Sequence, residues 1–245
     1  MNIHESTSQA WAVKVEGLTK SFSNKLALRG VDLEARQGEF VVIFGPNGAG
    51  KTTLIKVLAT IMNPSSGRIL IDGLNSRNSA EEIRRRIGVV THQTFLYSNL
   101  TTYENLEFYS RIYDVPKRKE RIHEVVAMVG MMNRLDDRVG TLSRGMQQRL
   151  SIARSLLHNP AVMLLDEPET GLDQEAVSML WSALVTEREG KRTVILVTHN
   201  LERGLELGDR LLILNKGKIV YEGAGKVSDL ASLKVIYEDN TGVRE

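Results

Sequence analysis

The stretch GPNGAGKTT, residues 45–53, decides the fold of this chain. It follows the apolar run Phe40–Phe44 and opens a segment, residues 51–58, whose apolar side chains recur at helical spacing. A buried strand, a glycine-rich loop and a helix in this order turn several backbone N–H groups toward one point, where they can hold a polyphosphate. The glycines let the backbone approach the phosphates closely. The stretch therefore predicts a phosphate-binding loop after a central strand of an α/β fold.

Each position of this loop is a candidate nucleotide-binding position. Lys51 would place a positive charge on the β- and γ-phosphates, and the hydroxyl of Thr52 is a candidate Mg²⁺ ligand. The alternative, an ordinary glycine-rich turn before a lysine, is disfavoured by the strand before the loop and the helix after it. The predicted nucleotide-binding residues of the loop are Gly45, Pro46, Asn47, Gly48, Ala49, Gly50, Lys51, Thr52 and Thr53.

A second motif, VMLLDE at residues 162–167, is an apolar strand that ends in two acids. Acids at the carboxyl end of a strand lie where open α/β sheets bind their ligands. Asp166 is a candidate Mg²⁺ ligand, usually through water. Glu167 is a candidate general base that orients and deprotonates the attacking water. The alternative for Glu167 is a cap on the turn before Pro168.

With these motifs the chain resembles the ATP-binding subunits of ABC transporters, and the resemblance covers nearly all of it. The stretch LSRGMQQR, residues 142–149, matches the family's signature, commonly LSGGQ. The resemblance implies that Ser143 and Gly145 contact the γ-phosphate of ATP held by another subunit, in a nucleotide-sandwich dimer with itself or a homologous ATPase. Ser143 is also a good N-cap for a helix whose dipole favours an anion. Arg144 and Met146 depart from the signature, so Gln147 or Gln148 is expected to replace the missing polar contact.

The resemblance assigns four further residues. Gln93 would reach the Mg²⁺ and take part in catalysis, and His199 would bond the γ-phosphate and the attacking water. Asp173 would report across the dimer, and Phe22 would stack on adenine, although an aromatic at a strand end is as often a core residue. The other histidines are predicted to be surface or structural residues: His4, His92, His123 and His158.

The expected fold class is α/β: a P-loop NTPase core with a mainly parallel sheet, an N-terminal antiparallel β subdomain and an inserted α-helical subdomain. We expect an ABC ATPase domain over residues 11–225, with the β subdomain and core at about 11–80 and 161–225 and the helical insertion at about 81–160. A capping box at Thr101 and Glu104 predicts one helix there, and others are expected over 117–132 and 174–189. Residues 1–10 and 226–245 are read as tails. The C-terminal tail could pack on the core, lengthen a dimer interface or remain mobile.

Composition excludes several classes of protein. The 245 residues hold 32 Lys plus Arg against 30 Asp plus Glu, a net charge of +2, so nucleic acid is not expected as a partner. The basic run Lys117–Arg121 is interpreted as a solvated helix start. Without cysteine the chain has no disulfide or thiolate site. No apolar run reaches the roughly 20 residues of a membrane span, and residues 1–10 lack signal-peptide features. We expect a cytoplasmic protein, peripheral on the cytoplasmic face of the cell membrane.

The resemblance also predicts separate transmembrane permease subunits, docking near Gln93–Tyr113. About half of the aromatic rings there are expected to be core residues. The stretches 91–115 and 142–160 are most similar to the haem-exporter ATPases of cytochrome c biogenesis. The alternatives are a drug, lipid or polysaccharide exporter ATPase, and a soluble ATPase of iron–sulfur cluster assembly. A non-hydrolysing regulatory subunit is disfavoured because Asp166, Glu167 and His199 are all present.

Overall fold

A computed structural model describes residues 11–185, 192–224 and 229–243 of the chain. The predicted tail 1–10 lies outside the described residues, as do 226–228 and 244–245 of the predicted C-terminal tail.

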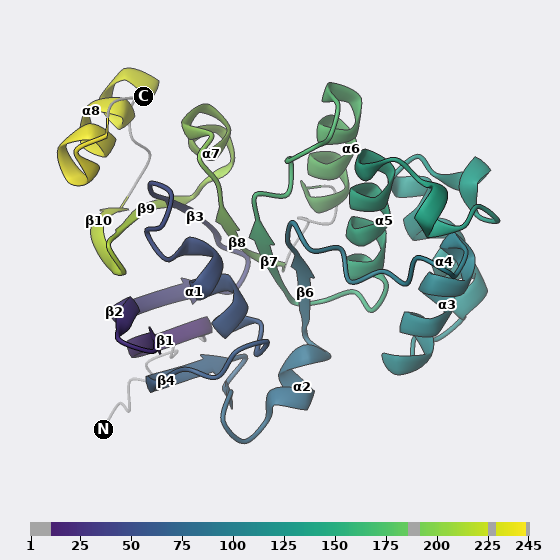
Figure 1. Cartoon of the computed structure of the whole chain (residues 1–245), viewed down its shortest axis with the longest axis horizontal. Helices are drawn as coiled ribbons and strands as arrows, with labels where there is room; N and C mark the ends of the chain where they lie inside the picture. Colours follow the sequence, from purple (N-terminus) through teal and green to yellow (C-terminus); the bar gives the residue numbers. More distant parts are fainter. Residues whose placement is uncertain (1–10, 186–191, 225–228, 244–245) are drawn as a thin grey trace, which may run out of the picture.

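The larger of two sheets has the strand order β10-β9-β3-β8-β7-β6 (Figure 1). All neighbouring pairs are parallel except β9 and β10, which form an antiparallel hairpin. This is the mainly parallel sheet that the sequence predicts. Its strands are β3 Phe40–Phe44, β6 Ile87–Val90, β7 Val162–Asp166, β8 Thr193–Val197, β9 Arg210–Asn215 and β10 Lys218–Ala224.

The central strands carry unbroken apolar runs because each strand contributes side chains to two cores. In β3, Val41 and Ile43 join one hydrophobic cluster, while Phe40, Val42 and Phe44 join the other on the opposite face. Strands β7 and β8 alternate in the same way. A strand covered on both faces gains from an apolar side chain at every position, which accounts for the unbroken runs in the sequence.

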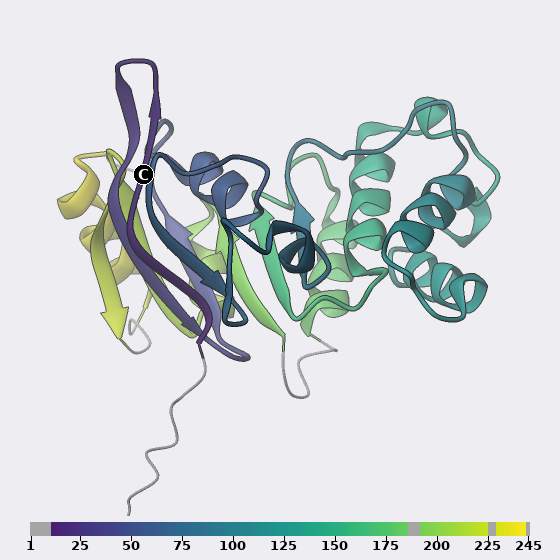
Figure 2. The same cartoon turned by 90° about the horizontal axis from the view of Figure 1, so that it is seen from below.

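The smaller sheet is antiparallel, with strand order β2-β1-β4-β5. Alternate residues of its first pair face each other inside the core, with Val13 opposite Ala35 and Val15 opposite Leu33. The hairpin of β1 and β2 projects from the body of the protein (Figure 2). Its strands are β1 Trp11–Phe22, β2 Lys25–Arg36, β4 Ser66–Ile71 and β5 Leu74–Asn75.

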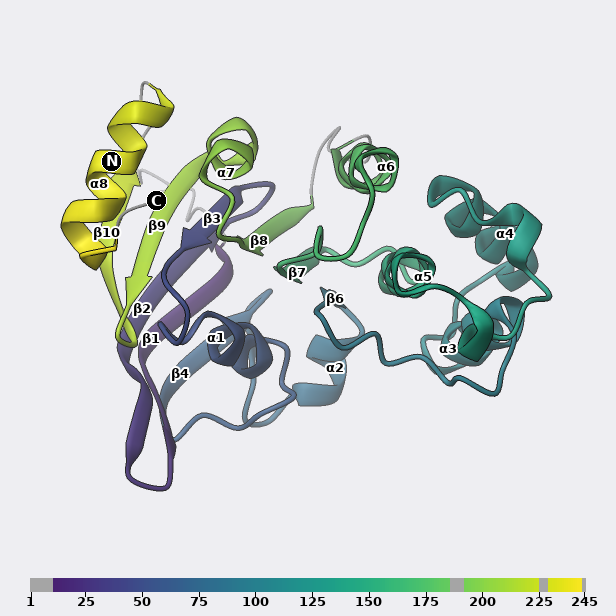
Figure 3. The same cartoon turned by 45° about the horizontal axis from the view of Figure 1, so that its top comes forward.

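Helices cover both faces of the larger sheet (Figure 3). Helices α1 (Lys51–Leu58) and α2 (Ala80–Arg84) lie on the side of the smaller sheet, and α6 (Gln174–Val185) and α7 (Leu201–Leu207) lie on the other side. The helix predicted over 174–189 ends at Val185 within the described residues, and 186–189 lie outside them.

A helical group stands at the end of the molecule farthest from the smaller sheet (Figure 1). It contains α3 (Thr102–Ile112), α4 (Arg118–Met128) and α5 (Arg144–Leu156), with short 3₁₀ turns at Met132–Arg134 and Val139–Thr141. The predicted capping box is present: Glu104 N donates to Thr101 Oγ1 at 3.1 Å, and Thr101 N donates to Glu104 Oε2 at 2.8 Å. No described helix has both the length and the apolarity needed to cross a bilayer.

One part of the expected helical stretch differs. Residues 87–90 form β6, which pairs in parallel with β7 and belongs to the sheet. The sequence Ile-Gly-Val-Val is short and β-branched, so a buried edge-strand position suits it better than a helix does.

Residues 230–241 form helix α8 (Leu230–Thr241), for which the sequence left three alternatives. Leu233 and Tyr237 are almost fully buried in the core that α7 and β9 also line. The amide of Asn215 donates to the carbonyl of Asn240 at 2.9 Å, which ties the end of α8 to the end of β9. Of the three alternatives, the described part of the tail packs on the core.

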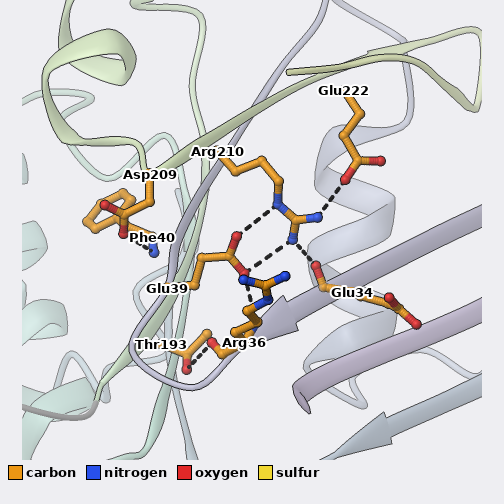
Figure 4. A network of polar contacts seen from close by, with 8 residues as sticks. All are labelled: Glu34, Arg36, Glu39, Phe40, Thr193, Asp209, Arg210 and Glu222. Carbon is orange, nitrogen blue, oxygen red and sulfur yellow. Dashed lines mark hydrogen bonds and ion pairs between the residues drawn. The ribbon is translucent and has the colours of Figure 1, made fainter. Parts of the chain in front are cut away.

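A polar network joins the two sheets at the amino ends of the parallel strands (Figure 4). Arg210 forms ion pairs with Glu39 at 2.9 Å and Glu222 at 2.5 Å, and its guanidinium also donates to the carbonyl of Glu34. The carboxylate of Asp209 accepts from the N–H of Phe40 at 2.9 Å. The network therefore joins the amino ends of β3 and β9 to the carboxyl ends of β2 and β10.

Candidate functional site

Four adjacent strands end at the same edge of the larger sheet. Strand β3 leads into the loop 45–53, β8 into Thr198 and His199, β7 into Glu167, and β6 into the segment 91–93. Because parallel strands place their carboxyl ends together, this edge is the expected ligand edge of an open α/β sheet.

The loop 45–53 needs glycine at two positions for steric reasons. A Cβ at Gly45 would lie 2.1 Å from the carbonyl oxygen of Leu214, near the carboxyl end of β9. A Cβ at Gly50, whose φ is +110°, would lie 2.6 Å from the carbonyl oxygen of Ala27. The loop is therefore packed against two other strands, and its inner side is left for a ligand.

Lys51 lies at the centre of this loop and is only 7% exposed. Its ammonium donates to the carbonyl oxygens of Gly45 at 2.5 Å and Pro46 at 3.1 Å. These two hydrogen bonds hold the Lys51 ammonium inside the loop. The sequence predicts a phosphate contact for this ammonium.

A cavity of about 760 Å³ opens over the loop. Phe22 is 46% exposed and lies on its wall, so it is a surface ring and not a core residue; the ammonium of Lys20 stands 5.2 Å from the ring centroid. The volume is in the range of small-molecule sites. The cavity is lined by Phe22, Lys25, Leu26, Ala27, Arg29, Asn47, Gly48, Ala49, Gly50, Lys51, Thr52, Thr53, His92, Asp166, Glu167, Thr170 and Lys216.

Asp166 fits a divalent cation. Its side chain is 3% exposed, and its Oδ2 has no hydrogen-bond partner among the described residues. Burial raises the pKa of Asp166, and a hydrogen bond with Thr52 opposes that effect. A buried carboxylate oxygen without a partner is costly unless a ligand satisfies it. The described residues contain no group of three or more His, Asp or Glu able to hold a metal, so phosphate and water oxygens would have to complete the ligand shell.

Glu167 lines the cavity and contacts His199, which does not line it. Oε2 of Glu167 lies 2.7 Å from Nδ1 of His199, and the N–H of Glu167 donates to the carbonyl of Val197 at 2.9 Å. Glu167 has a φ of +50°, an uncommon conformation for a residue other than glycine. Its carboxylate bonds to His199, so the alternative role as a turn cap is not what the structure shows.

The structure places His92, and not Gln93, on the wall of the cavity. The side chain of Gln93 is exposed, while its backbone is held by the hydroxyl of Thr91, which accepts from Gln93 N at 3.1 Å and donates to Gln93 O at 2.9 Å. His92 is exposed, as predicted for a surface residue, but it also lines the cavity, which the sequence analysis missed. The signal that could have identified His92 is its position just after β6, at the ligand edge of the sheet.

Ser143, Gly145 and Asp173 line a second cavity, of about 220 Å³, and none of the three lines the first. Ser143 caps α5, with its Oγ accepting from Met146 N at 3.3 Å. Arg149 on the same helix donates to both carboxylate oxygens of Asp173 at 3.0 and 3.1 Å. A hydrogen bond from the N–H of Ala176, together with the charge of Arg149, lowers the pKa of Asp173.

The two glutamines after the signature bond within the chain. Gln147 donates to the carbonyls of Val139 and Leu142, and the buried Gln148 donates to the carbonyl of Pro168. Both side-chain amides therefore donate to the chain's own backbone.

The aromatic segment after Gln93 divides into two groups. Tyr97 and Phe108 are 50% and 39% exposed and contact each other edge to face, with ring centroids 5.1 Å apart. Tyr103, Tyr109 and Tyr113 pack against the core, in agreement with the expectation for about half of these rings.

The family model described as ABC transporter matches residues 28–170. The chain belongs to this family. It is an ATP-binding subunit of an ABC transporter, and its enzymatic class is ATPase. The predicted P-loop NTPase fold is confirmed by the solved cassettes that share it.

Two curated relatives and one solved structure illustrate the sequence identity and structural similarity of this ABC ATPase to other members of its family. ABC transporter ATP-binding protein NatA of Bacillus subtilis (strain 168) is 36% identical over 201 residues, covering 81% of this chain and 82% of that protein. Daunorubicin resistance ATP-binding protein DrrA3 of Streptomyces coeruleorubidus is 36% identical over 214 residues, covering 86% and 68%. The ATP-binding cassette MJ0796, solved as a post-hydrolysis dimer bound to ADP and Pi, has a TM-score of 0.80 at 31% identity, covering 86% of this chain and 97% of that chain.

Proposed function

We propose that this ATPase hydrolyses ATP between two nucleotide-binding subunits and thereby powers transport through separate permease subunits. The observation that carries the proposal is the hydrogen bond, of 2.7 Å, between His199 and Glu167, whose side chain lines the same cavity as Lys51. A carboxylate and an imidazole beside a phosphate-binding loop are suited to activate water against a γ-phosphate.

In the proposed reaction the chain's own groups act on water and on ATP. Glu167 accepts a proton from the attacking water, whose oxygen bonds to the γ-phosphorus while the bond to the β–γ bridging oxygen breaks. The products are ADP and inorganic phosphate. His199 holds the carboxylate through Nδ1, and in its protonated form, in which both ring nitrogens carry hydrogen, it can also donate Nε2–H to the γ-phosphate. Lys51 stabilises charge on the β- and γ-phosphates, and Phe22 stacks on adenine.

Thr52, Asp166 and Gln93 are the proposed Mg²⁺ ligands. The cation would offset charge between the β- and γ-phosphates. Thr52 and Asp166 both line the cavity, and Oδ2 of Asp166 is buried with no hydrogen-bond partner in the described part of the chain. Gln93 has to turn toward the cavity, since its side chain faces solvent in this structure.

The second half of each site comes from another subunit in this proposal. Ser143 and Gly145 lie outside the cavity of their own chain, so they are free to contact the nucleotide of a partner. The solved dimer of the relative MJ0796 supports this arrangement. Asp173, at the second cavity, would lie at the same interface.

The permease would dock near Gln93–Tyr113, where Tyr97 and Phe108 present exposed rings. Such docking would hold the subunit on the cytoplasmic face of the cell membrane. We assign the ABC ATPase domain to residues 11–225. The helical insertion follows β6, which belongs to the larger sheet, and runs to about residue 160. The more specific hypothesis of haem export rests on the resemblance of residues 91–115 and 142–160, and neither relative reported above carries haem in its name.

Capture of partners tests the proposal. Tagged chain would be recovered from its own cells in mild detergent, and the co-purifying proteins identified by mass. Polytopic membrane proteins are the expected partners, and a haem-handling protein among them would support haem export. Soluble partners alone would contradict the transport function and favour the iron–sulfur assembly alternative.

A further inference from the structure

Glu169 lies two residues after Glu167, and its side chain links helices α6 and α7. Its Oε1 accepts from the indole N–H of Trp181 on α6 at 2.5 Å, and the same oxygen lies 3.3 Å from Nε of Arg203 on α7. Trp181 is 6% exposed, and the Glu169 and Arg203 side chains are 22% and 31% exposed. The bridge is therefore partly shielded from water, where a charge pair holds its geometry better than at an open surface.

The bridge adjoins the catalytic pair in space. A small cavity of about 160 Å³ is lined by Glu169 and Trp181 together with Glu167 and His199. Helix α7 begins directly after His199, and its N-cap, Asn200, accepts from the N–H of Arg203 at 3.0 Å. Through Arg203, Glu169 thus reaches the first turn of α7, the helix that follows His199 and its N-cap Asn200.

The bridge also holds the loop that carries the base. Within this loop, Thr170 N donates to Glu167 O at 3.1 Å, and Leu172 N donates to Glu169 O at 3.0 Å. The loop continues to Asp173, which Arg149 holds from α5. Glu169 is the point at which the middle of the loop is fixed to both α6 and α7.

We infer that Glu169 is a positioning residue for ATP hydrolysis: through Arg203 it keeps Glu167 and His199 in their hydrogen-bonded arrangement. The inference rests on the proposed roles of that pair. Glu169 does not line the nucleotide cavity, so its effect on hydrolysis has to act through other residues. Its loss should slow the chemical step and leave ATP binding intact, since small displacements of catalytic groups reduce rate far more than affinity.

The test compares Glu169→Gln, Arg203→Gln and the double variant in single-turnover hydrolysis, with the full chain in excess over ATP. Glu169→Gln retains an oxygen for the indole N–H and removes the charge that attracts Arg203. We expect each single variant to hydrolyse about three- to tenfold more slowly, with the Kd for ATP changed by less than about twofold. The double variant should be no slower than the singles, because all three remove the same interaction.

Glu206→Gln is the matched control. Glu206 is the other acidic partner of Arg203, at 2.5 Å, and its side chain is 62% exposed. Removing it leaves Glu169 and Arg203 paired, so hydrolysis should stay at the wild-type rate. A further readout is the indole N–H resonance of Trp181, one of two tryptophans in the chain, assigned with a Trp11→Phe variant. It should shift in Glu169→Gln and Arg203→Gln and remain in place in Glu206→Gln.

The inference is overturned if both single variants hydrolyse within about twofold of wild type, if their losses add in the double variant, or if ATP affinity falls in parallel. Measuring Glu167→Gln in the same experiment separates failure of the proposed base from failure of the Glu169 bridge. Rapid hydrolysis in Glu167→Gln contradicts the proposed base, whereas a slow Glu167→Gln together with a normal Glu169→Gln contradicts the bridge alone.

Discussion

Glu167 and His199 are 32 residues apart in the chain, yet Oε2 of one lies 2.7 Å from Nδ1 of the other. The register of the sheet produces this contact. Asp166 at the end of β7 pairs with Val197 at the end of β8, so the residues that follow leave the sheet side by side. The register of two neighbouring strands thus brings the two residues together.

Replacement of Glu167 by Gln should abolish most hydrolysis and preserve ATP binding. The amide keeps the shape of the side chain but cannot accept a proton, so turnover should fall by at least ~10²-fold. ATP-bound dimer should accumulate because the shared γ-phosphate persists. Phosphate release and size-exclusion chromatography with ATP measure both effects, and near-normal turnover would rule out Glu167 as the base.

Replacement of Lys51 by Ala should act on binding instead. Loss of a charge-assisted contact to the phosphates should weaken ATP affinity by roughly 10- to 100-fold. Lys56→Ala on the same helix is the control, because Lys56 does not line the cavity. Calorimetric titration of ATP distinguishes the two variants, and equal affinities would count against the lysine's role.

Gly45→Ala should disrupt the loop through a single methyl group. That methyl would lie 2.1 Å from the Leu214 carbonyl, so the loop or β9 must move, at about 1–3 kcal/mol of unfolding free energy. Gly73→Ala is the control, since Gly73 also has a positive φ, +77°, but faces open space. Nucleotide affinity should fall in Gly45→Ala and stay unchanged in Gly73→Ala, and equal affinities in the two variants would contradict this account of the loop.

His158 should make the protein less stable in mild acid. Burial lowers the pKa of His158 from 6.5 to about 4, while Nε2 contacts the carbonyl of Ile87 and the ring stacks on Tyr113 at 4.0 Å. The unfolded state therefore takes up a proton at higher pH than the folded state does. This contribution to stability is fully present above about pH 6.5 and is lost as the pH falls toward 4, by up to about 3 kcal/mol.

Urea unfolding at a series of pH values measures this loss. His158→Phe keeps a ring against Tyr113 but cannot titrate, so its unfolding free energy should vary less between pH 6.5 and 4. An identical pH dependence in both proteins would assign the effect to other groups.

The parts of the fold that local sequence controls were predictable. The loop 45–53, the strand ending at Asp166 and the capping box at Thr101 each depend on residues close together in the chain, and the structure contains all three. The hairpin of β9 and β10 was missed, although Asn-Lys-Gly at 215–217 is a turn signal between them. Helix α8 is harder to predict because only two of its described residues, Leu233 and Tyr237, are fully buried, too few to give a clear period.

The site was predictable in residue type but less so in orientation. Strand order brings Glu167 and His199 together, whereas the direction of Gln93 depends on how Thr91 holds the backbone after β6. The bridge formed by Glu169 joins residues from a loop and two helices, and no spacing in the chain signals it. Such contacts arise only when distant elements pack.

The separation of the two cavities on one chain has a consequence for how activity scales with the amount of protein. If each nucleotide must be completed by a second chain, hydrolysis at low concentration is limited by encounters between chains and rises with the square of their concentration. Diluting the isolated subunit would then lower its specific activity, whereas tethering two copies to one membrane assembly would make the activity independent of dilution.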